Sequence, residues 1–453
     1  MSRTLLITTV APYPKNVGKR VMLGGICDWF AAERAAADFR VLSFDILPPA
    51  LDTGFPRLSG PSRWRKFWNL AWHTTVRRDK SMQEALFWSP EAQRQIAEAI
   101  ADYEPELVIY DTLRAGQYHR HVPRASSFRA VLYLDDLFSV RYERILATLA
   151  RFPGVTIDAL GNFVEHIPKA LVSLYHAFPG MQRWLLRRER RLVTKSEDTQ
   201  PVDFDLALLV SDREVQRLRH RARLEHVFTL RPFLDAAPAR SPRRWTGRPE
   251  FVFLGSLNLP HNAVSLELFI QRGFEALLDQ IPDVRLVVVG RHAGARLQLL
   301  AAKYPDHIEL AGFVDDLEPL LAGCAGMIAP LLFGSGVKIK VIDALRMGVP
   351  VVATDYGAEG IATDGRNGLI VENDIDQFGA QCRRLLAPEV NAAQSAASLV
   401  LFETHYSARV VRDDYDRLFT LPAQAPSEGH HAIAHDYRRR TKFEPPRQRE
   451  LEV

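Results

Sequence analysis

The sequence predicts an α/β protein built from two doubly wound domains, and three observations support this prediction. Short apolar runs bounded by polar or turn residues alternate with amphipathic stretches through both halves of the chain. A stretch rich in proline and arginine, residues 236–249, separates the halves and has no apolar period, so we expect a linker there. The length of 453 residues is roughly three times that of an average domain.

Composition narrows the class of protein. Apolar residues make up 47% and charged residues 25% of the chain, which excludes collagen-like, low-complexity and wholly disordered classes. The net charge of +4 is too small to indicate nucleic-acid binding. Cys27, Cys324 and Cys382 are scattered, so neither a disulfide framework nor a zinc site is expected. No apolar run reaches the ~20 residues that span a bilayer, and the apolar start of the chain is interpreted as a strand rather than a signal peptide. We therefore expect a cytoplasmic protein.

The N-terminal domain is expected to cover residues 1–235. Its first strand candidate is a β-branched run that ends before Pro12, and four further apolar runs follow. The predicted strands are 5–10, 39–47, 107–111, 130–136 and 205–211. Two insertions without strand signals, near 48–90 and 141–200, show helical periodicity with many Arg and aromatic residues.

The C-terminal domain is expected over residues 250–391 and alternates more regularly. Its predicted strands are 251–257, 284–289, 308–314, 327–332 and 349–354. One helix is predicted after the first strand, because six apolar residues share a stripe: Leu266, Phe269, Ile270, Phe274, Leu277 and Leu278. Further helices are expected near Leu297, over 337–347 and over 392–423, and the polar tail 424–453 is expected to be disordered.

A glycine-rich turn in the C-terminal domain is the strongest candidate site. Gly334, Ser335 and Gly336 stand between a predicted strand and a predicted helix, which aims free backbone N–H groups and the positive helix end at an anion, most naturally a phosphate. Lys338 and Lys340 add positive charge in the first helical turns. Asp343 lies on the same helix face as Lys340 and can accept hydrogen bonds from ribose hydroxyls while that lysine balances its charge. The alternative is a plain βαβ unit with a solvated Lys–Asp pair.

The motifs around this turn resemble a known family. Gly-Ser-Gly-Val-Lys-Ile-Lys-Val-Ile-Asp-Ala-Leu (334–345), Gly-Val-Pro-Val-Val-Ala-Thr (348–354) and Gly-Ala-Glu-Gly (357–360) are similar to the GSG-x-K-x-K-x-x-E-A-L, G-x-PVVAT and GAEG of group 1 (family 4-like) retaining glycosyltransferases of the GT-B fold. The resemblance covers residues 250–420 well. It implies two Rossmann-like domains facing a central cleft, with helices after about Ala392 that cross back to the N-terminal domain.

The resemblance also implies which residues bind the donor, a nucleoside diphosphate sugar. The diphosphate and nucleotide would contact residues of three loops: Gly334, Ser335, Gly336, Val337, Lys338, Asp343, Gly312, Phe313, Val314, Gly255 and Ser256. The sugar would lie against Gly357, Ala358, Glu359 and Gly360. Lys338, Lys340 and the loop amides would stabilise the charge on the departing diphosphate. No cofactor and no metal are expected, because fixed positive groups replace a metal ion. Asp203–Asp205 and Asp374–Asp376 spell D-x-D, but we interpret both as helix or strand ends.

The acceptor is implied to be a glycan or a lipid-linked acceptor bound by the N-terminal domain. The implied residues follow three predicted strands: Gly18, Arg20, Asp111, Arg114, Asp135 and Asp136. Many members of the family have a His after the fourth strand, where this chain reads Leu134-Asp135-Asp136. Asp136 stands where the family often keeps an Asp, and we place it with Lys338, Lys340 and Asp343 among the catalytic candidates. Alternatively, the Asp pair merely caps the end of a strand.

Several departures from the family pattern keep other functions open. The usual pair of glutamates on the phosphate helix is replaced by Ser335 and Asp343, and the basic residue that often follows the opening strand is absent around 256–258. The preferred interpretation is an enzyme of surface polysaccharide or glycoconjugate assembly. One alternative is a catalytically degenerate scaffold subunit of a glycan-assembly complex, and a weaker one is a nucleotide-sugar epimerase.

Two helical segments have the composition of a membrane-surface helix. Trp64, Phe67, Trp68 and Trp72 share one stripe, and residues 60–80 hold six basic side chains and one acidic one. Residues 183–191 combine a Trp with several arginines in the same way. They predict a contact with the inner face of a membrane. The alternative is an amphipathic helix packed on the domain with a solvated basic face.

Overall fold

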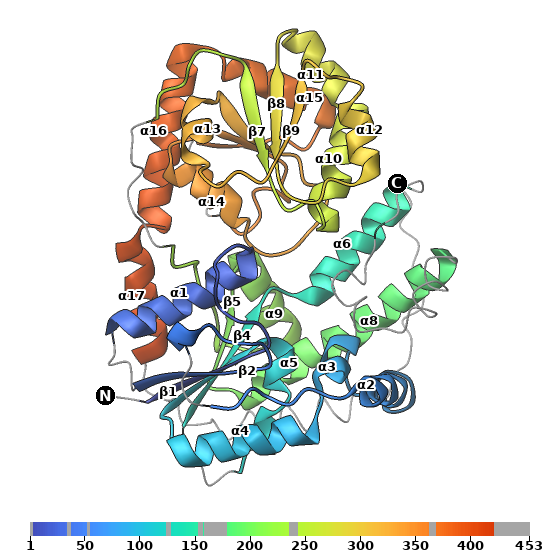
Figure 1. The fold of residues 1–453 in the computed structure, drawn as a ribbon, viewed down its shortest axis with the longest axis vertical. Coiled ribbons are helices and arrows are strands. Elements are labelled where there is room, and N and C mark those ends of the chain that lie inside the picture. Colours follow the sequence, from blue (N-terminus) through green and yellow to red (C-terminus); the bar gives the residue numbers. More distant parts are fainter. Residues whose placement is uncertain are drawn as a thin grey trace.

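The computed structural model describes residues 3–33, 38–51, 55–123, 128–152, 157, 179–234, 243–361 and 368–420. Two six-stranded sheets, one in each half of the chain, are flanked by helices (Figure 1). Neighbouring strands pair in parallel throughout both sheets. The predicted architecture of two doubly wound α/β domains is therefore confirmed.

The N-terminal sheet has the strand order β2-β1-β3-β4-β5-β6. Its strands are β1 (Thr4–Thr8), β2 (Phe39–Ser43), β3 (Leu107–Asp111), β4 (Arg129–Asp135), β5 (Leu206–Leu209) and β6 (Val227–Thr229). β6 was not predicted, because three residues with only one buried side chain carry no strand pattern. The other five strands occur where they were predicted, mostly with shorter ends.

The helices of this domain include those in the two insertions. They are α1 (Gly18–Glu33), α2 (Arg63–Asn69), the π-helical η3 (Leu70–Arg77), α3 (Met82–Phe87), α4 (Pro90–Tyr103), α5 (Thr112–Gly116), α6 (Phe138–Arg151), α8 (Pro179–Thr199) and α9 (Asp212–Ala222). Single 3₁₀ turns occur at Pro49–Leu51, His119–His121 and Pro201–Asp203. Strong caps define the starts of α3 and α4: Ser81 and Glu84 form a capping box, and Ser89 precedes a proline at the first helical position.

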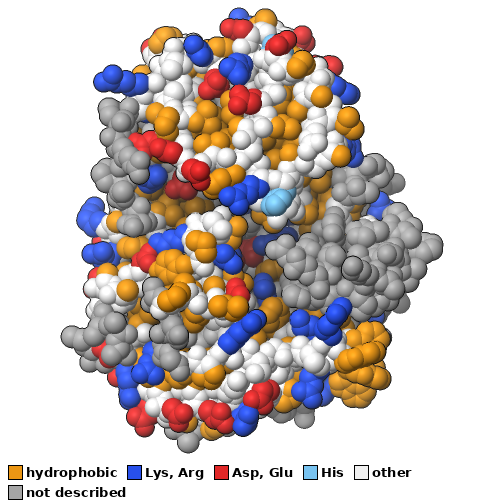
Figure 2. Space-filling view, viewed as in Figure 1, with side chains coloured by type: hydrophobic (Ala, Val, Ile, Leu, Met, Phe, Trp, Pro, Cys, Tyr) orange, Lys and Arg blue, Asp and Glu red, His pale blue; other side chains and the backbone are white. Residues whose placement is uncertain are grey.

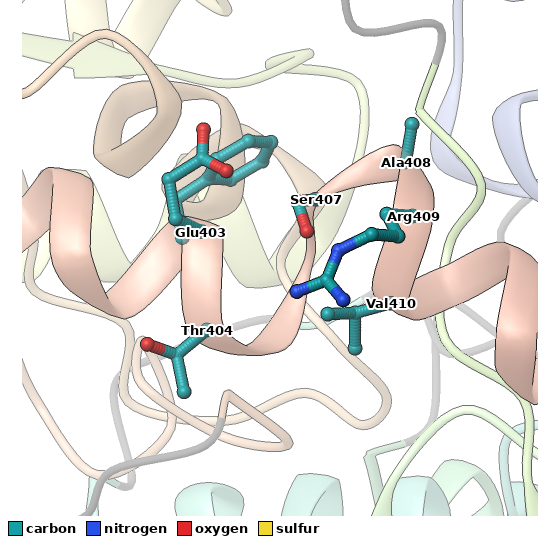
Figure 3. Close-up of a pocket in the computed structure, with 7 residues that line it drawn as sticks. Glu403, Thr404, Ser407, Ala408, Arg409 and Val410 are labelled. Atoms are coloured by element: carbon teal, nitrogen blue, oxygen red, sulfur yellow. The ribbon is translucent and has the colours of Figure 1, made fainter.

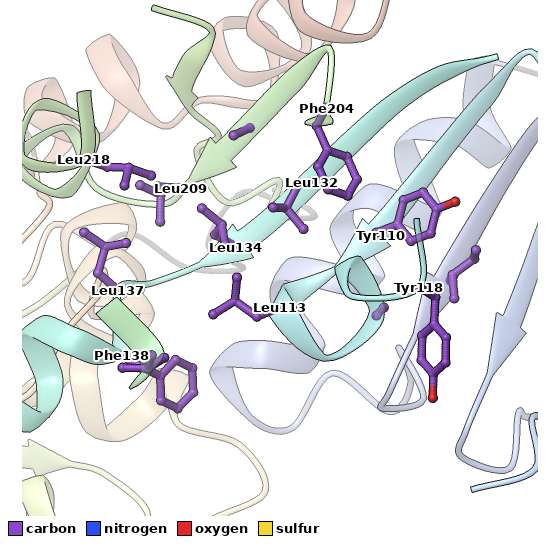
Figure 4. Close-up of a cluster of buried hydrophobic side chains, with 14 of the residues drawn as sticks. Tyr110, Leu113, Tyr118, Leu132, Leu134, Leu137, Phe138, Phe204, Leu209 and Leu218 are labelled. Carbon is purple, nitrogen blue, oxygen red and sulfur yellow. The ribbon is translucent and has the colours of Figure 1, made fainter. Parts of the chain in front are cut away.

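The core on one side of this sheet joins strands and crossover helices (Figure 4). Tyr110, Leu132 and Leu209 point from three adjacent strands toward Leu113 of α5 and Leu218 of α9. Each fully buried side chain of this size contributes about 1.5–3 kcal/mol relative to an exposed one. The crossover helices are therefore fixed against the strands, and so are the loops at the strand ends.

The C-terminal sheet has the order β12-β11-β10-β7-β8-β9. Its strands are β7 (Glu250–Leu254), β8 (Arg285–Val289), β9 (Ile308–Gly312), β10 (Gly326–Ala329), β11 (Val351–Ala353) and β12 (Leu369–Val371). Its helices are α10 (Pro260–Arg272), α11 (Phe274–Gln280), α12 (Ala295–Ala301), α13 (Glu318–Gly323), α14 (Ile339–Arg346), α15 (Ile375–Arg384), α16 (Pro388–His405) and α17 (Ala408–Thr420).

The prediction of a single helix after β7 is wrong. The chain forms two helices there, α10 and α11, which meet at Gly273. A Cβ at this glycine would lie 2.3 Å from the side chain of Ile375. The close approach of α15 therefore requires a residue without a side chain, and α10 ends there. The predicted apolar stripe still faces the core, since Leu266, Phe269 and Phe274 are fully buried.

The last helix returns to the N-terminal domain. Trp29 of α1 is nearly fully buried and contacts the rings of Tyr415 and Phe419 in α17. Arg231 forms an ion pair with Asp414, and Arg129 donates to the carbonyl of Leu418 at 2.9 Å. The chain therefore connects its two domains twice, once through the segment before β7 and once through α16 and α17 (Figure 1).

Candidate functional site

Each sheet reverses its direction of winding at one point, and these points define where ligands bind. In the N-terminal sheet the reversal lies between β1 and β3, and in the C-terminal sheet between β7 and β10. In open α/β sheets a crevice opens at this place, beyond the carboxyl ends of the strands. The predicted glycine turn follows β10. Of the predicted acceptor residues, Gly18 follows β1 and Asp111 is the last residue of β3.

The loop Gly334–Val337 has the geometry of an anion cradle. Gly334 has a φ of 137° and Gly336 one of 69°, which favour glycine at both positions. No residue in the described part of the chain accepts a hydrogen bond from the backbone N–H of Gly334, Ser335, Gly336 or Val337. These groups lie just before the first turn of α14, where the helix dipole also favours negative charge.

Lys338 holds this loop together from inside. Lys338 is only 7% exposed. Its ammonium donates to the carbonyl of Ser335 at 3.0 Å and to that of Gly336 at 2.7 Å. Burial lowers the pKa of Lys338, and the charge of Glu359 counteracts part of this shift. The lysine therefore turns the loop carbonyls inward, which leaves the N–H groups on the other side of the turn.

The expectations for Lys340 and Asp343 need correction. Lys340 donates to the side chain of Asn262 at 2.9 Å and lies 4.6 Å from the ring centre of Phe253. Burial, together with the charge of Lys338, lowers its pKa to about 7, so it does not carry a full positive charge at neutral pH. The predicted Lys340–Asp343 pair is not formed, because Asp343 faces Arg346 one helical turn onward at 3.7 Å.

Two arginines from the other domain reach the glycine loop, and neither was predicted from the sequence. Arg141 of α6 donates through Nε to the Ser335 hydroxyl at 2.9 Å, and Arg144 donates to the Gly334 carbonyl at 2.6 Å. They lie three residues apart and so project from one face of α6. The visible signal was an Arg pair in the first turns of the helix after β4, but nothing in the sequence indicated its partner loop 190 residues away.

Two predicted site residues hold these arginines. Asp136 accepts a hydrogen bond from Arg141 at 2.5 Å and another from the Ser335 hydroxyl. Burial opposes ionisation of Asp136, but these donors outweigh it and hold its pKa below the ordinary value. Glu359, expected to bind the donor sugar, pairs with Arg144 through both carboxylate oxygens.

Two further titratable residues border the loop and were not predicted. Glu214 is buried behind Leu137, whose backbone N–H donates to it at 3.3 Å; burial raises its pKa well above the usual range. A Cβ at Gly334 would lie 3.7 Å from the Cβ of His261. Burial lowers the pKa of His261 well below its ordinary value, and the nearby lysines and Arg141 add to this effect.

The face where the acceptor was expected contains a partly buried ionic cluster. Lys19 forms an ion pair with Asp111 and lies 3.4 Å from a carboxylate oxygen of Asp135. Thr8 donates to Asp111 at 3.0 Å, and Tyr133 donates to Asp135 at 2.7 Å. Burial raises the pKa of Asp135, and Lys19 counteracts part of that shift. Lys19 was missed, although it lies directly between the predicted Gly18 and Arg20.

The backbone is strained beside this cluster. Thr112, the residue after Asp111, has a φ of 63°, and Asp135 has a φ of 70°. For a β-branched residue this conformation costs of order 1–3 kcal/mol, and such strain concentrates at functional sites. It turns the chain sharply at the carboxyl ends of β3 and β4, where the two carboxylates converge on Lys19.

The other predicted acceptor residues, Gly18, Arg20 and Arg114, have different neighbours. Gly18 begins α1 beside α14, since a Cβ there would lie 3.8 Å from Ile339. Arg20 points to Asp45 at 3.9 Å, away from the Asp111 cluster. The Arg114 guanidinium lies 5.6 Å from the ring of Phe87, and burial lowers its pKa while Asp111 raises it.

The loops after β7 and β9 follow the carboxyl ends of two strands of the sheet that also carries the glycine loop. Ser256 donates to Asn258 at 2.7 Å, and Gly255 packs against Asn262 so closely that a Cβ would lie 2.8 Å from it. Gly312 has a φ of 67°, and its neighbour Phe313 is exposed. The Arg291 guanidinium lies 3.8 Å over the Phe313 ring. Val314 is half-buried. The exposed ring of Phe313 is a planar group on which a nucleobase can stack.

A cavity of about 480 Å³ opens beside Glu359 at the domain boundary. Both domains line it, including Arg144, Thr148 and Arg213 from one and Leu331, Thr354 and Tyr356 from the other. Basic side chains also gather along this boundary in the space-filling view (Figure 2). Its volume is within the range of small-molecule sites. A second cavity, of about 640 Å³ at the junction of α16 and α17, contains none of the predicted site residues (Figure 3).

The two D-x-D stretches have structural roles. Asp374 caps α15 by accepting a hydrogen bond from the Asp376 backbone at 3.0 Å. Asp203 pairs with Arg120, and Asp205 accepts from the Ala130 backbone at 2.7 Å. These contacts agree with the interpretation of both stretches as element ends.

Comparison with known proteins bears on both the family and the fold. Residues 248–388 match the family described as Glycosyl transferases group 1, which confirms the resemblance drawn from the motifs of this part of the chain. Phosphatidyl-myo-inositol mannosyltransferase from Mycobacterium leprae is 32% identical over 169 residues, 35% of this chain and 45% of the relative. The chain spans less than half the length of the curated relatives it matches.

Solved structures match over both domains. The Anabaena protein HepE in complex with UDP and glucose aligns with a TM-score of 0.59 at 13% identity, over 93% of this chain and 100% of HepE. Sucrose-phosphate synthase from Thermosynechococcus elongatus aligns with a TM-score of 0.59 at 15% identity, over 92% of this chain and 98% of the synthase. These matches confirm the GT-B fold.

Proposed function

We propose that this protein is a glycosyltransferase that moves a sugar from a nucleoside diphosphate sugar to a glycan or lipid-linked acceptor, with retention of configuration. The observation that carries this proposal is the Gly334–Val337 loop, whose unbonded N–H groups stand at the reversal point of a sheet that matches the group 1 family. The complex of HepE with UDP and glucose supports a nucleotide-sugar donor. A role in surface polysaccharide or glycoconjugate assembly fits the mannosyltransferase relatives.

The donor would extend across the crevice along the strand ends. The base would lie near Phe313, the diphosphate on the amides of Gly334 to Val337, and the sugar in the cavity beside Glu359. The acceptor would approach from the opposite side, where Asp111, Asp135 and Lys19 lie. This arrangement brings both substrates between the two domains and excludes water from the reacting bond when they close.

Sugar transfer requires stabilisation of the negative charge that develops on the departing nucleoside diphosphate. The bond between the anomeric carbon and the phosphate oxygen breaks, and its electron pair stays on that oxygen. The acceptor hydroxyl oxygen bonds to the anomeric carbon on the same face, and its proton passes to the departing phosphate oxygen. Loop amides and fixed cations lower the energy of this charge development electrostatically. We propose that no metal takes part, since the D-x-D carboxylates already cap and pair within the protein.

A nucleotide panel tests the proposal. We expect one of UDP, GDP, ADP, dTDP and CMP to raise the free energy of unfolding by about 2.7 kcal/mol when present at 100 times its dissociation constant. The measurement is thermal unfolding with each nucleotide, followed by product analysis with the matching nucleotide sugar. A glycosylated acceptor supports the proposal, whereas free modified sugar indicates an epimerase. No stabilisation by any nucleotide, with or without acceptor, contradicts it and favours the scaffold alternative.

We also propose that the enzyme works at the cytoplasmic face of a membrane, held there by the exposed aromatic surface of α2 and η3. Trp64, Trp68 and Trp72 are 79%, 66% and 51% exposed, and Trp184 of α8 is 56% exposed. A hydrophobic patch bordered by Lys and Arg lies over α2 (Figure 2). The two predicted segments are neighbours, since Arg188 donates to the carbonyl of Thr74. Indoles flanked by basic side chains suit the headgroup region of anionic lipids.

The described part of the chain gives this surface no spanning helix. No single helix there is long and apolar enough to cross a membrane; one pair passes by length and composition, Ile375–Arg384 with Pro388–Thr420, but it is bent by 102°. The proposed contact is therefore with the surface of the bilayer, through side chains that are at least half exposed.

Replacing two indoles tests the membrane contact. We expect W64S/W68S to lower binding to phosphatidylglycerol-containing vesicles at least tenfold, because each indole buries about 150–250 Å² when it is covered. The measurement is co-sedimentation with these vesicles and with neutral phosphatidylcholine vesicles, at low and high salt. L299S is the matched control, because Leu299 is also exposed but lies on α12 of the other domain. Equal binding of wild type and W64S/W68S to the anionic vesicles contradicts the proposal.

A further inference from the structure

The cations expected to hold the diphosphate are not the ones that face the loop. Lys340 is turned toward Asn262 and Phe253, and Lys338 is used by the carbonyls of Ser335 and Gly336. The loop after β7 offers no basic residue between Ser256 and Asn258. The C-terminal domain therefore presents many N–H groups at this site but little exposed positive charge.

The N-terminal domain supplies what is missing. Arg141 and Arg144 reach the outer side of the loop, at Ser335 and Gly334. Both guanidinium groups are fixed by flat neighbours, with Arg141 4.3 Å from the ring centre of Phe138 and Arg144 5.1 Å from that of Tyr356. Stacking and ion pairing hold the fork of each arginine in one orientation.

We propose that Arg141 and Arg144 bind the donor diphosphate, so that the donor site is complete only when the N-terminal domain closes on the C-terminal one. This inference rests on the proposed transferase function. A guanidinium has five N–H donors, and the partners seen here use only some of them. Phosphate oxygens match the remaining donors in the two-pronged geometry that arginine provides. When donor is bound, its phosphate oxygens take the place of the Ser335 hydroxyl and the Gly334 carbonyl.

The two carboxylates then act as positioning residues. Asp136 holds Arg141, and Glu359 holds Arg144 across the domain boundary. Both carboxylate side chains are almost fully buried, at 3% and 2% exposure, so each remains beside its arginine. The charge that develops on the phosphate oxygen as the anomeric bond breaks would meet positive charge only in the closed form. Hydrolysis of the donor in the open form is thereby limited, because the open site lacks this stabilisation.

Neutral variants of the two arginines test the inference. We expect R141Q and R144Q each to weaken binding of the nucleoside diphosphate at least tenfold while binding of the corresponding nucleoside changes less than threefold. We expect kcat for transfer to fall at least a hundredfold, with partial recovery in R141K and R144K. The measurements are calorimetric titration with both ligands, steady-state kinetics and thermal unfolding. R217Q is the matched control, since Arg217 pairs with Glu143 of α6 on the exposed side.

The results that contradict the inference differ from the result that contradicts the proposed function. If diphosphate affinity and kcat stay within threefold of wild type, the inference is wrong and the proposed function stands. If nucleoside and diphosphate binding weaken equally, the arginines only maintain the fold, and the inference is also wrong. If a Gln variant does not fold, the comparison is made with the Lys variant, in which the charge remains and the two-pronged geometry is lost. If wild type binds no nucleotide at all, it is the proposed function that fails.

Discussion

K338M is expected to lower kcat/KM for transfer by about 10²–10³-fold, the scale of losing one electrostatic group at a developing anion. The ammonium of Lys338 is the donor to two consecutive loop carbonyls, those of Ser335 and Gly336. Methionine fills the space but leaves both carbonyls without this donor, so the loop turns and its N–H groups lose their alignment. Steady-state kinetics with the nucleotide sugar measures the effect.

The control for this variant is K303M, which removes an exposed lysine after α12. Its kinetics are expected to match wild type. Thermal unfolding of both variants separates the loss of the loop from a loss of the fold. A K338M protein that turns over within threefold of wild type would show that the loop does not depend on this lysine.

G336A is expected to lower kcat roughly tenfold while costing about 1–2 kcal/mol of stability. The stability cost follows from the φ of 69°, which an L-residue adopts only with strain. The larger effect on turnover has a second cause. A Cβ at this position would lie 3.3 Å from the Cβ of Asp136 and 3.5 Å from Val210, both in the N-terminal domain. The added methyl therefore crowds Asp136, so the loop or the N-terminal domain must shift slightly, and the rate of a reaction between positioned groups is sensitive to such shifts.

G247A is the matched control, because Gly247 has a similar φ of 81° and a Cβ there meets nothing within 4 Å. It carries the backbone strain without the contact between domains. Kinetics and unfolding of both variants are compared. Equal kinetic losses in G336A and G247A, or none in G336A, would contradict a role for this glycine in closure.

The fold was largely predictable because its information is local. Parallel strands buried on both faces appear as short apolar runs, and ten of the strands were found in this way. β12 was not among the strands predicted from apolar runs, and β6 was missed because its three residues leave no pattern. The break at Gly273 could not be predicted either, since its cause is Ile375 on a helix a hundred residues later.

The residues of the candidate site also fall into a group that could be predicted from the sequence and a group that could not. The glycine loop, Asp136 and Glu359 could be selected because each belongs to a motif that is continuous in the sequence. Their partners could not, since Arg141 and Arg144 are ordinary residues of a helix in an insertion, and Lys19 stands one position from a residue chosen instead.

The sequence by itself determined the two-domain α/β architecture, the glycine-rich loop and its resemblance to group 1 glycosyltransferases, because strand patterns and turn glycines express local physics. Only the tertiary structure decided which charges meet. Burial of Lys340 lowers its pKa to about 7, and the approach of the two domains places Arg141 beside Ser335. Charge–charge energies depend on distance and burial, and both are set by packing between residues that are far apart in the chain.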